Sequence, residues 1–397
     1  QEGVKIDRYR ATFVGKLAQV LPVSVSQSLL VFYGFLTGLE SLMVLAGACA
    51  NLPLPFVVQQ PATNPMQQQG GRRGRGRNNH QNFARDAAQS IGRAMELAEL
   101  SMKEHSHDSE SDIIAAMGVV LAFRVEARTG ATDHQLNEWC VRNQVSRERV
   151  QAIMDLEDHI KFELGSFVPF RDVDEPEVQQ KQLTRLPNVV RGMISTAFAS
   201  QALEVTAEGS MRFKIKEGAH GIFTDLAAAP DLHTPSSIRW EVGTVVVPVT
   251  LSLRHSHLLG SYTTVVKDTK TFYLSCLLFA HRLHYEIFED DDGQYYEFVL
   301  NFHGRTRAIE ANEATGKAII QFREHLTAIC SGLAHVHSSF QADKTPDEAE
   351  VNKMNAMQKG VVGALEGFFF GKKGEELVFT EIQQGDEVVE RLSALTR

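Results

Sequence analysis

The chain has few cysteines and no long hydrophobic run. Its 397 residues include four cysteines, far apart and without a Cys-x-x-Cys pair, at positions 49, 140, 276 and 330. This spacing provides neither a disulfide framework nor a cysteine-rich zinc site, and it fits a reducing, intracellular compartment. The most apolar stretch, residues 29–54, is interrupted by Gly, Glu, Asn and Pro. It falls short of the ~18 consecutive apolar residues that a membrane span requires, so we expect no membrane partner.

Catalytic motifs are also missing. The sequence contains no Gly-x-x-x-x-Gly-Lys-[Ser/Thr] phosphate loop, no Gly-x-Ser-x-Gly elbow and no His-Glu-x-x-His pair. Gly371-Lys372-Lys373-Gly374 lacks the spacing to wrap a phosphate. ATPase, hydrolase, metalloprotease and small-molecule enzyme functions therefore have no supporting motif, and we expect no catalytic residue in this segment.

Two clusters of side chains suggest a metal site but favour a simpler interpretation. The acidic residues 289–292 precede Gly293, and an Asp-Gly step between two β-type runs indicates a solvated hairpin tip. Histidines occur in close pairs, at 105/107, 255/257, 281/284 and 335/337. No cysteine or carboxylate stands beside them at metal-ligand spacing, so we expect surface or strand-face histidines and no metal site.

The remaining composition is that of an ordinary globular protein. Hydrophobic residues make up 43% and charged residues 22%, and the formal net charge is −9. The length suggests two or three domains of about 150 residues each. A net acidic surface argues against nonspecific nucleic-acid binding by the whole molecule, but it leaves room for a local basic groove.

Positive charge is concentrated in one segment of simple composition. Residues 59–82 are rich in Gln, Gly, Pro, Asn and Arg, which predicts a flexible linker. At its centre Arg72, Arg73, Arg75 and Arg77 are interspersed with glycines. Guanidinium groups on a flexible chain can contact phosphates and stack on unpaired bases, so RNA binding is one interpretation. A solvated linker with incidental charge is the other.

Hydrophobic periodicity divides the chain into a helical and a β-type part. Apolar residues at helical spacing predict small packed helices over residues 12–50, and Asp112 is a candidate N-cap further on. Further helices are expected at 84–103, 112–128, 146–164 and 189–202, with a short one at 133–143. Short β-type runs then predict a barrel or sandwich, closed by a helix over 313–333. The expected strands are residues 212–215, 221–224, 242–253, 262–266, 271–278, 283–288 and 295–302.

Several segments share motifs with one protein family, in the same order along the chain. They are residues 15–23, 38–42, 54–56, 112–128, 139–143, 146–164, 190–202, 232–238, 265–274, 298–309 and 317–333. The first three resemble the winged-helix region of DEAH-box helicases of the RNA helicase A-like branch. The next three resemble the ratchet-like helical bundle of that family, and the others resemble its OB-fold and closing helix.

The resemblance implies a multidomain α+β architecture: a winged-helix remnant, a ratchet-like bundle, and an OB-fold β-barrel with a capping helix. The expected parts are a winged-helix region (1–58), an Arg/Gly-rich linker (59–82), the bundle (83–168), a second linker (169–186), the OB-fold (187–335) and an extension of unassigned fold (336–397). In such helicases this half closes the channel for single-stranded RNA and hydrolyses no ATP. The family's first winged-helix element would precede Gln1, so we expect RecA-like domains upstream, with ATP and Mg²⁺ bound there.

The family's RNA-binding positions can be transferred only where its motifs match. The loop of His233, Thr234, Ser236 and Ser237 would approach RNA bases and backbone, although Thr234 is one residue more than the family pattern contains. Lys267, Thr269 and Lys270 would lie on a neighbouring strand. Hydroxyl, imidazole and ammonium groups can bond phosphates, 2′-hydroxyls and base edges. An ordinary Ser/Thr turn is the alternative for the loop. By charge alone, candidates in the bundle are Arg124, Arg128, Arg142 and Arg147, which otherwise belong to a solvated helix face or to an i,i+4 pair.

The sequence thus predicts an RNA-binding, non-catalytic helicase segment involved in RNA processing. Expected partners are single-stranded RNA, the RecA-like domains, and protein cofactors such as glycine-rich or zinc-finger activators. The compartment stays open between nucleus, cytoplasm and mitochondrion, a mitochondrial RNA-processing helicase being one candidate. The alternative is a stand-alone scaffold that works through protein contacts, with Phe368 to Phe370 as a docking element.

Overall fold

The computed structural model describes a mixed α+β protein. The residues it describes are 12–57, 79–107, 109–169, 173, 175–207, 210–213, 222–224, 244–254, 257–267, 269–279, 284–290, 293–302, 305–342, 344, 347–370 and 378–381. The helices are α1 (Phe13–Val20), α2 (Val25–Thr37), α3 (Glu40–Asn51), α4 (Asn79–His105), α5 (Asp112–Arg128), α6 (Asp133–Arg142), α7 (Arg147–Phe167), α8 (Pro176–Arg185), α9 (Pro187–Ala197), α10 (Thr269–Phe279), α11 (Glu313–Gln341) and α12 (Glu348–Phe370), with a 3-10 turn η2 (Ala199–Gln201). None of these described helices is both long and apolar enough to cross a membrane.

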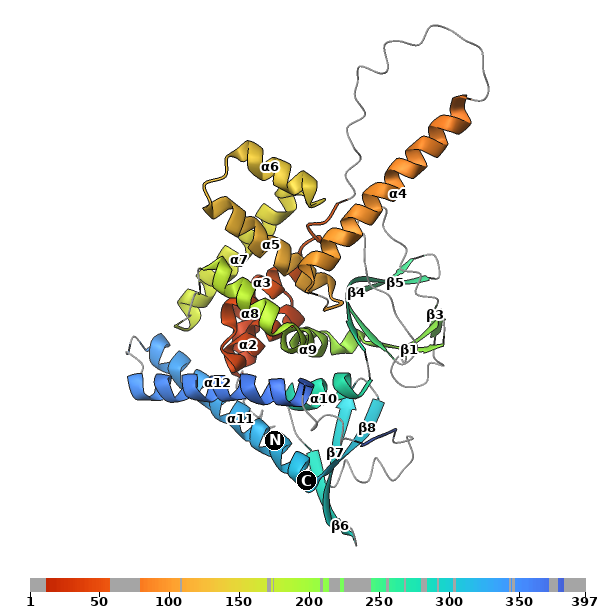
Figure 1. The fold of residues 1–397 in the computed structure, drawn as a ribbon. Helices are drawn as coiled ribbons and strands as arrows, with labels where there is room; N and C mark the ends of the chain where they lie inside the picture. The colour runs from red at the N-terminus through yellow and green to blue at the C-terminus, as the bar shows by residue number, and fades with distance from the viewer. Residues whose placement is uncertain are drawn as a thin grey trace, which may run out of the picture.

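Helices α2 and α3 form the centre of the molecule, with the other helices around them (Figure 1). Both are buried over nearly their whole length, and they belong to one hydrophobic cluster that extends from Leu17 to Phe368. Their crossing is close because Gly34 has no side chain: a Cβ there would lie 2.9 Å from the Cβ of Met43. The predicted packed helices between 12 and 50 are confirmed, and Pro22 lies between α1 and α2.

The bundle helices α4 to α7 follow the sequence pattern closely. Helix α5 spans the predicted residues, but its N-cap is Ser111, whose hydroxyl accepts from the backbone N–H of Ile114 at 3.4 Å. The expected cap Asp112 lies instead at the first helical position, where it is buried. Helix α4 extends away from the body (Figure 1). It crosses α5 at Gly118, where any Cβ would overlap the backbone carbonyl of His105.

One helix lies in a segment predicted to be a linker. Helix α8 occupies most of residues 169–186, begins with Pro176 at its first turn, and buries only Pro176, Gln179 and Leu183. These three residues share one face of the helix, but Pro176 and Gln179 are not strongly apolar. The periodic pattern of hydrophobic residues is therefore too weak to predict this helix from the sequence. The linker prediction for this segment is wrong.

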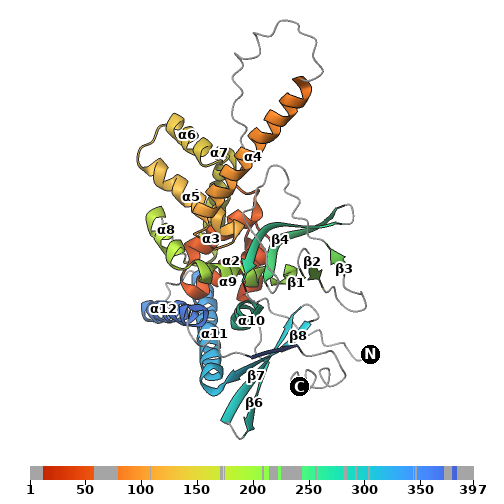
Figure 2. The same cartoon turned by 45° about the vertical axis from the view of Figure 1, so that its right-hand side comes forward.

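The strands form two separate sheets, which lie at different places on the molecule (Figure 2). One has the order β3-β2-β1-β4-β5 and the other β6-β7-β8-β9. The strands are β1 (Leu203–Ala207), β2 (Ser210–Phe213), β3 (Ile222–Thr224), β4 (Val245–Arg254), β5 (His257–Val266), β6 (His284–Asp290), β7 (Gly293–Phe302), β8 (Arg305–Asn312) and β9 (Val378–Glu381). All described pairings between strands are antiparallel. The described strands therefore do not form the single closed barrel that the family resemblance implies.

Helix α10 separates the two sheets along the chain, and here the prediction of a strand over 271–278 is wrong. The helix is almost completely buried, including Phe272, Leu274, Cys276 and Leu278. A short run that is apolar on all sides shows no period, so sequence alone cannot distinguish a buried helix from a buried strand. The aromatic and Thr content of the run then favours the wrong choice.

The C-terminal helices complete the core. The predicted hairpin tip is confirmed, since Asp290 pairs with Gly293, whose φ is +127°. Helix α11 packs against β7 at Gly316, where a Cβ would overlap the ring of Tyr296. In α12, Val361, Leu365 and Phe368 are buried, and the ring of Phe368 meets that of Phe322 edge-on at 5.9 Å. Phe368 is therefore a core residue and does not form the docking element suggested by sequence.

Candidate functional site

The bundle and the five-stranded sheet meet at a polar junction between the N-terminus of α5 and strand β5. The backbone N–H of Val265 donates to the carbonyl of Glu110 at 2.9 Å, and the hydroxyls of Ser111 and Thr264 lie 2.8 Å apart. The carboxylate of Asp112 accepts from the backbone N–H of Thr263 at 2.9 Å and from its hydroxyl at 3.2 Å. A carboxylate at the first turn of α5 is also stabilised by the helix dipole. The junction thus fixes the end of β5 to the bundle.

The backbone around this junction is strained. Glu110 and Tyr262 have φ values of +52° and +56°, and His107, three residues before Glu110, has φ +51°. Non-glycine residues adopt the left-handed backbone conformation only where their surroundings hold them in it, and such residues cluster at functional positions. The junction is therefore a candidate functional element as well as a structural one.

Lys267 lies directly after β5, next to the junction. Its side chain is 65% exposed, and its Nζ is 3.5 Å from Oε1 of Glu110. An ion pair at this distance and exposure contributes little to stability, so the ammonium stays accessible to an anion. Of the predicted RNA-binding residues outside the bundle, Lys267 is the one whose side chain the structure describes.

The other predicted RNA-binding residues fall outside this description. His233, Thr234, Ser236 and Ser237 lie in the segment 225–243, and Arg72, Arg73, Arg75 and Arg77 lie in the segment 58–78, both outside the described residues. Thr269 and Lys270 begin helix α10 and not the expected strand, and their side chains are likewise not described.

The arginines of the bundle are engaged in contacts within the protein. Arg124 donates to both oxygens of Glu157, at 3.2 and 2.7 Å, and Lys161 lies 3.1 Å from the same carboxylate. The Glu157 side chain is fully buried and the two cations are 15% and 13% exposed. Arg124 is thus part of a buried ionic cluster, which we call the Glu157 cluster, and not part of an open phosphate path.

The remaining candidate arginines are similarly placed. Arg147 donates to Asp133 at 2.6 Å and to Asn137 at 3.0 Å, and Arg128 lies 3.9 Å from Glu177. Arg142 is exposed at the end of α6. Arg147 and Arg128 thus lie next to carboxylates on other helices, 14 and 49 residues away in sequence, and not in the i,i+4 pairs considered from the sequence.

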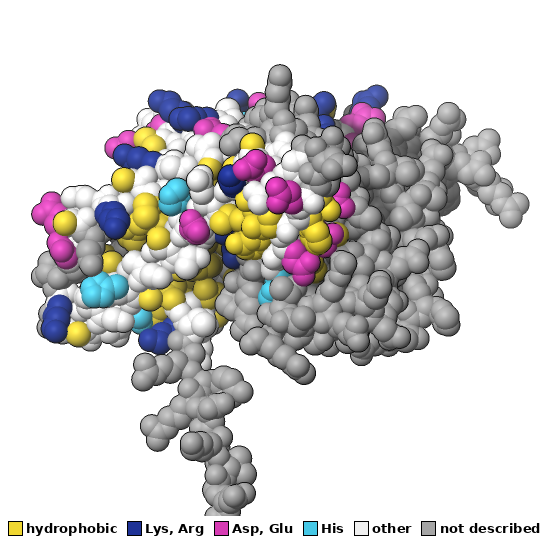
Figure 3. Space-filling model, turned by 90° about the horizontal axis from the view of Figure 1, so that it is seen from below, with side chains coloured by type: hydrophobic (Ala, Val, Ile, Leu, Met, Phe, Trp, Pro, Cys, Tyr) yellow, Lys and Arg dark blue, Asp and Glu magenta, His cyan; other side chains and the backbone are white. Residues whose placement is uncertain are grey.

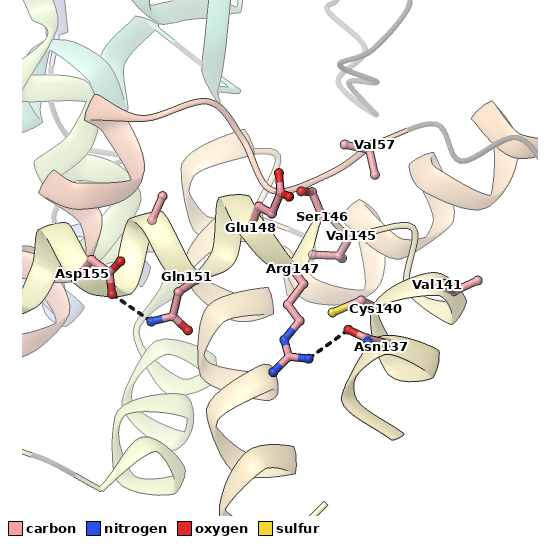
Figure 4. Close-up of a pocket in the computed structure, with 11 residues that line it drawn as sticks. Val57, Asn137, Cys140, Val141, Val145, Ser146, Arg147, Glu148, Gln151 and Asp155 are labelled. Carbon is pink, nitrogen blue, oxygen red and sulfur yellow. Dashed lines mark hydrogen bonds between the residues drawn. The ribbon is translucent and has the colours of Figure 1, made fainter. Parts of the chain in front are cut away.

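An open hollow of about 960 Å³ lies between α6, α7 and the segment that follows α3 (Figure 4). Val57, Val141, Val145 and Cys140 provide its apolar surface, and Glu148, Gln151 and Asp155 from α7 provide its polar rim. Arg149 holds the segment before Val57 in place by donating to the carbonyls of Leu54 and Phe56 at 3.0 and 3.4 Å. We call this feature the α6–α7 hollow.

Its electrostatic character is acidic. Arg147 points toward Asn137 and is paired with Asp133, while Gln151 donates to Asp155 at 2.8 Å (Figure 4). Within the described part of the chain, Glu148 has no hydrogen bond or ion pair. Two carboxylates on the rim disfavour a phosphate and favour a cation. Sequence reasoning missed this feature, although residues 148, 151 and 155 are spaced to share one face of a helix.

A second partly apolar surface lies at the other end of the molecule, where α11, α12 and the four-stranded sheet face outward. Hydrophobic and acidic side chains lie next to one another there (Figure 3). Tyr285 and Ile287 of the edge strand β6 are 37% and 49% exposed. They pair with Phe298 and Tyr296 of β7, which are buried. Tyr285 and Ile287 therefore lie on the same face of the sheet as these core residues, at its exposed edge.

The cysteines and histidines carry no reactive arrangement in the described part of the chain. Burial raises the pKa values of the Cys49 and Cys276 thiols far above the ordinary range, and it raises the pKa of Cys330 to about 11. His337 is buried, stacks on Phe167 and approaches the Phe167 carbonyl at 2.8 Å. Among the described residues, no group of three or more His, Cys, Asp or Glu side chains has a geometry that could hold a metal ion.

No known protein-family model matches the chain, and no curated protein sequence matches it significantly.

Proposed function

We propose that the chain is the non-catalytic C-terminal half of an ATP-dependent RNA helicase, and that it binds single-stranded RNA. In this proposal residues 12–57 are the winged-helix remnant, helices α4 to α7 the ratchet-like bundle, and the five-stranded sheet the counterpart of the OB-fold. ATP and Mg²⁺ belong to RecA-like domains of the longer protein. RNA processing or remodelling is the function of the whole, with glycine-rich or zinc-finger proteins as candidate activators.

The observation that supports this proposal most is the junction between α5 and β5. Asp112 and Ser111 bond β5 at Thr263 and Thr264, which holds the strand that leads to the exposed Lys267 beside the bundle. A cation held by a rigid element can contact a phosphate without a large loss of side-chain and backbone freedom. His233, Thr234, Ser236, Ser237, Thr269 and Lys270, together with the four arginines of residues 72–77, complete the proposed RNA contacts.

Equilibrium binding of a fluorescent single-stranded RNA across a salt series tests the proposal. Lys267→Ala should weaken binding and reduce the log-log salt slope by about 0.7, the value for one lost phosphate contact to a single strand. Lys353→Ala, at an exposed lysine of α12, is the matched control and should leave the slope unchanged. Equal behaviour of the two variants contradicts a role of Lys267 in RNA binding.

The second candidate function is a scaffold that works through protein contacts. It is favoured by the engagement of Arg124 and Arg147 with carboxylates of the bundle, which leaves those two cations unsuited to an RNA path. A chain that binds no RNA even at low salt supports the scaffold. Upstream phosphate-loop and Asp-Glu-Ala-His-type motifs in the longer protein favour the helicase.

A further inference from the structure

Helix α7 presents a continuous exposed stripe to solvent. Glu148, Gln151, Asp155, Asp158 and Phe162 are all exposed and follow one another at intervals of three or four residues. This spacing places them on one face of the helix. From Gln151 to Phe162 the stripe is about 16 Å long, at 1.5 Å per residue. The α6–α7 hollow lies beside its N-terminal part.

The surface formed by the hollow and the stripe is apolar at its two ends and acidic between them. At one end Val141, which is 54% exposed, belongs to the hollow, and at the other end the Phe162 side chain is 74% exposed. The carboxylates of Glu148, Asp155 and Asp158 lie between them along α7. Within the described residues, neither Glu148 nor Asp158 forms an ion pair or hydrogen bond, so both can accept an external cation.

The cations on α7 have partners within the protein, and Arg149 among them donates to the carbonyls of Leu54 and Phe56. Arg147 is bound to Asp133 and Asn137, and Lys161 is directed into the buried Glu157 cluster. His159 lies 3.5 Å from Glu163. The stripe therefore keeps a negative potential, which repels phosphates and attracts basic side chains.

We propose that the hollow and the stripe of α7 together bind an amphipathic, basic helix of a partner protein. A helix laid along α7 places an aliphatic side chain in the hollow against Val141. Its Lys or Arg side chains, two turns apart, meet Glu148 and Asp155, and a second apolar side chain covers Phe162. This is the helix-in-groove mode of recognition, in which anchors recur at positions i, i+3 or i+4, and i+7. Charge complementarity selects a basic protein segment over RNA as the occupant.

The proposal is tested with a fluorescent 18-residue helix of leucine, alanine and lysine, with leucines at every third and fourth position. We expect Glu148→Lys combined with Asp155→Lys to weaken its binding about tenfold or more, because both charge contacts become repulsive. Glu324→Lys combined with Glu348→Lys makes the same change in net charge on exposed sites of α11 and α12, and should change the affinity less than about twofold.

A second variant separates packing from charge. Phe162→Ala removes an exposed ring, so the fold should be retained, and the affinity for the peptide should fall about fivefold. The same peptide with glutamate in place of lysine should not bind. Hydrogen exchange in the complex should show protection in α6 and α7.

Four results would overturn the proposal. The first is that the two charge-reversal pairs weaken peptide binding equally, and the second is that the peptide protects amides from exchange elsewhere than in α6 and α7. The third is that Phe162→Ala lowers the affinity for RNA. The fourth is that the peptide binds more tightly when Arg72, Arg73, Arg75 and Arg77 are changed to Ala. The third result would assign the surface to RNA, and the fourth to the chain's own arginine segment. The salt series with Lys267→Ala is a separate measurement, so failure of one proposal is distinguishable from failure of the other.

Discussion

The Glu157 cluster provides a sharp test of how the bundle is held together. Glu157→Gln keeps the size of the side chain but removes the negative charge that both Arg124 and Lys161 contact. The two cations then face each other within a site where all three side chains are buried or nearly so. Removing one partner of a buried ionic group costs about 3–5 kcal/mol of unfolding free energy, because the remaining charge is left uncompensated.

The assay is urea-induced unfolding followed by far-ultraviolet circular dichroism. Asp133→Asn is the comparison, because it removes the surface pair of Asp133 with Arg147, in which Asp133 is 87% exposed, and it should cost less than about 1 kcal/mol. Replacing Arg124, Glu157 and Lys161 together by methionine should recover most of the loss, because the buried charges disappear together. A loss below about 1 kcal/mol for Glu157→Gln would refute the argument that this cluster is desolvated and coupled.

Three further outcomes are expected. Asp112→Ala removes two hydrogen bonds from Thr263 and should lower the free energy of unfolding by about 1–3 kcal/mol. Hydrogen exchange in β5 should become faster, and unchanged exchange would contradict the inference that Asp112 holds β5 to the bundle. Gly118→Ala should destabilise the bundle more than Gly92→Ala, because a Cβ at Gly92 meets nothing within 4 Å. Thermal unfolding measures the difference, and equal melting temperatures of the two variants would contradict the close crossing of α4 and α5. At pH 8 Cys330 should react with iodoacetamide far more slowly than free cysteine, because a pKa of about 11 leaves on the order of one thiol in a thousand ionised. A rate equal to that of free cysteine contradicts its burial.

Sequence alone predicts those elements whose signals are local. Helix α5 has local signals at both ends, because Ser111 and Asp112 stand at its start and Gly130 follows its end with φ +84°. The hairpin at Gly293 is predictable for the same reason, since its Asp-Gly step lies within the turn itself. Ser146 likewise caps α7, as its position before the helix indicates.

The errors concern burial and partners far away in sequence. Helix α10 is buried on all sides, so its period is hidden. Arg124 looks like a phosphate ligand until Glu157, 33 residues later, is seen beside it. The acidic residues of α7 resemble a solvated helix face, and nothing in their spacing shows that α6 lies beside them and encloses a hollow. Tertiary contacts of this kind carry no local signal.

The central claim, that this chain binds single-stranded RNA beside the junction of α5 and β5, is tested most directly by the salt dependence of RNA binding in wild type and Lys267→Ala. The account predicts binding by the wild type at low salt. It also predicts a slope that falls by about 0.7 in Lys267→Ala and stays unchanged in Lys353→Ala. Absence of binding at low salt, or identical slopes in all three proteins, would contradict it.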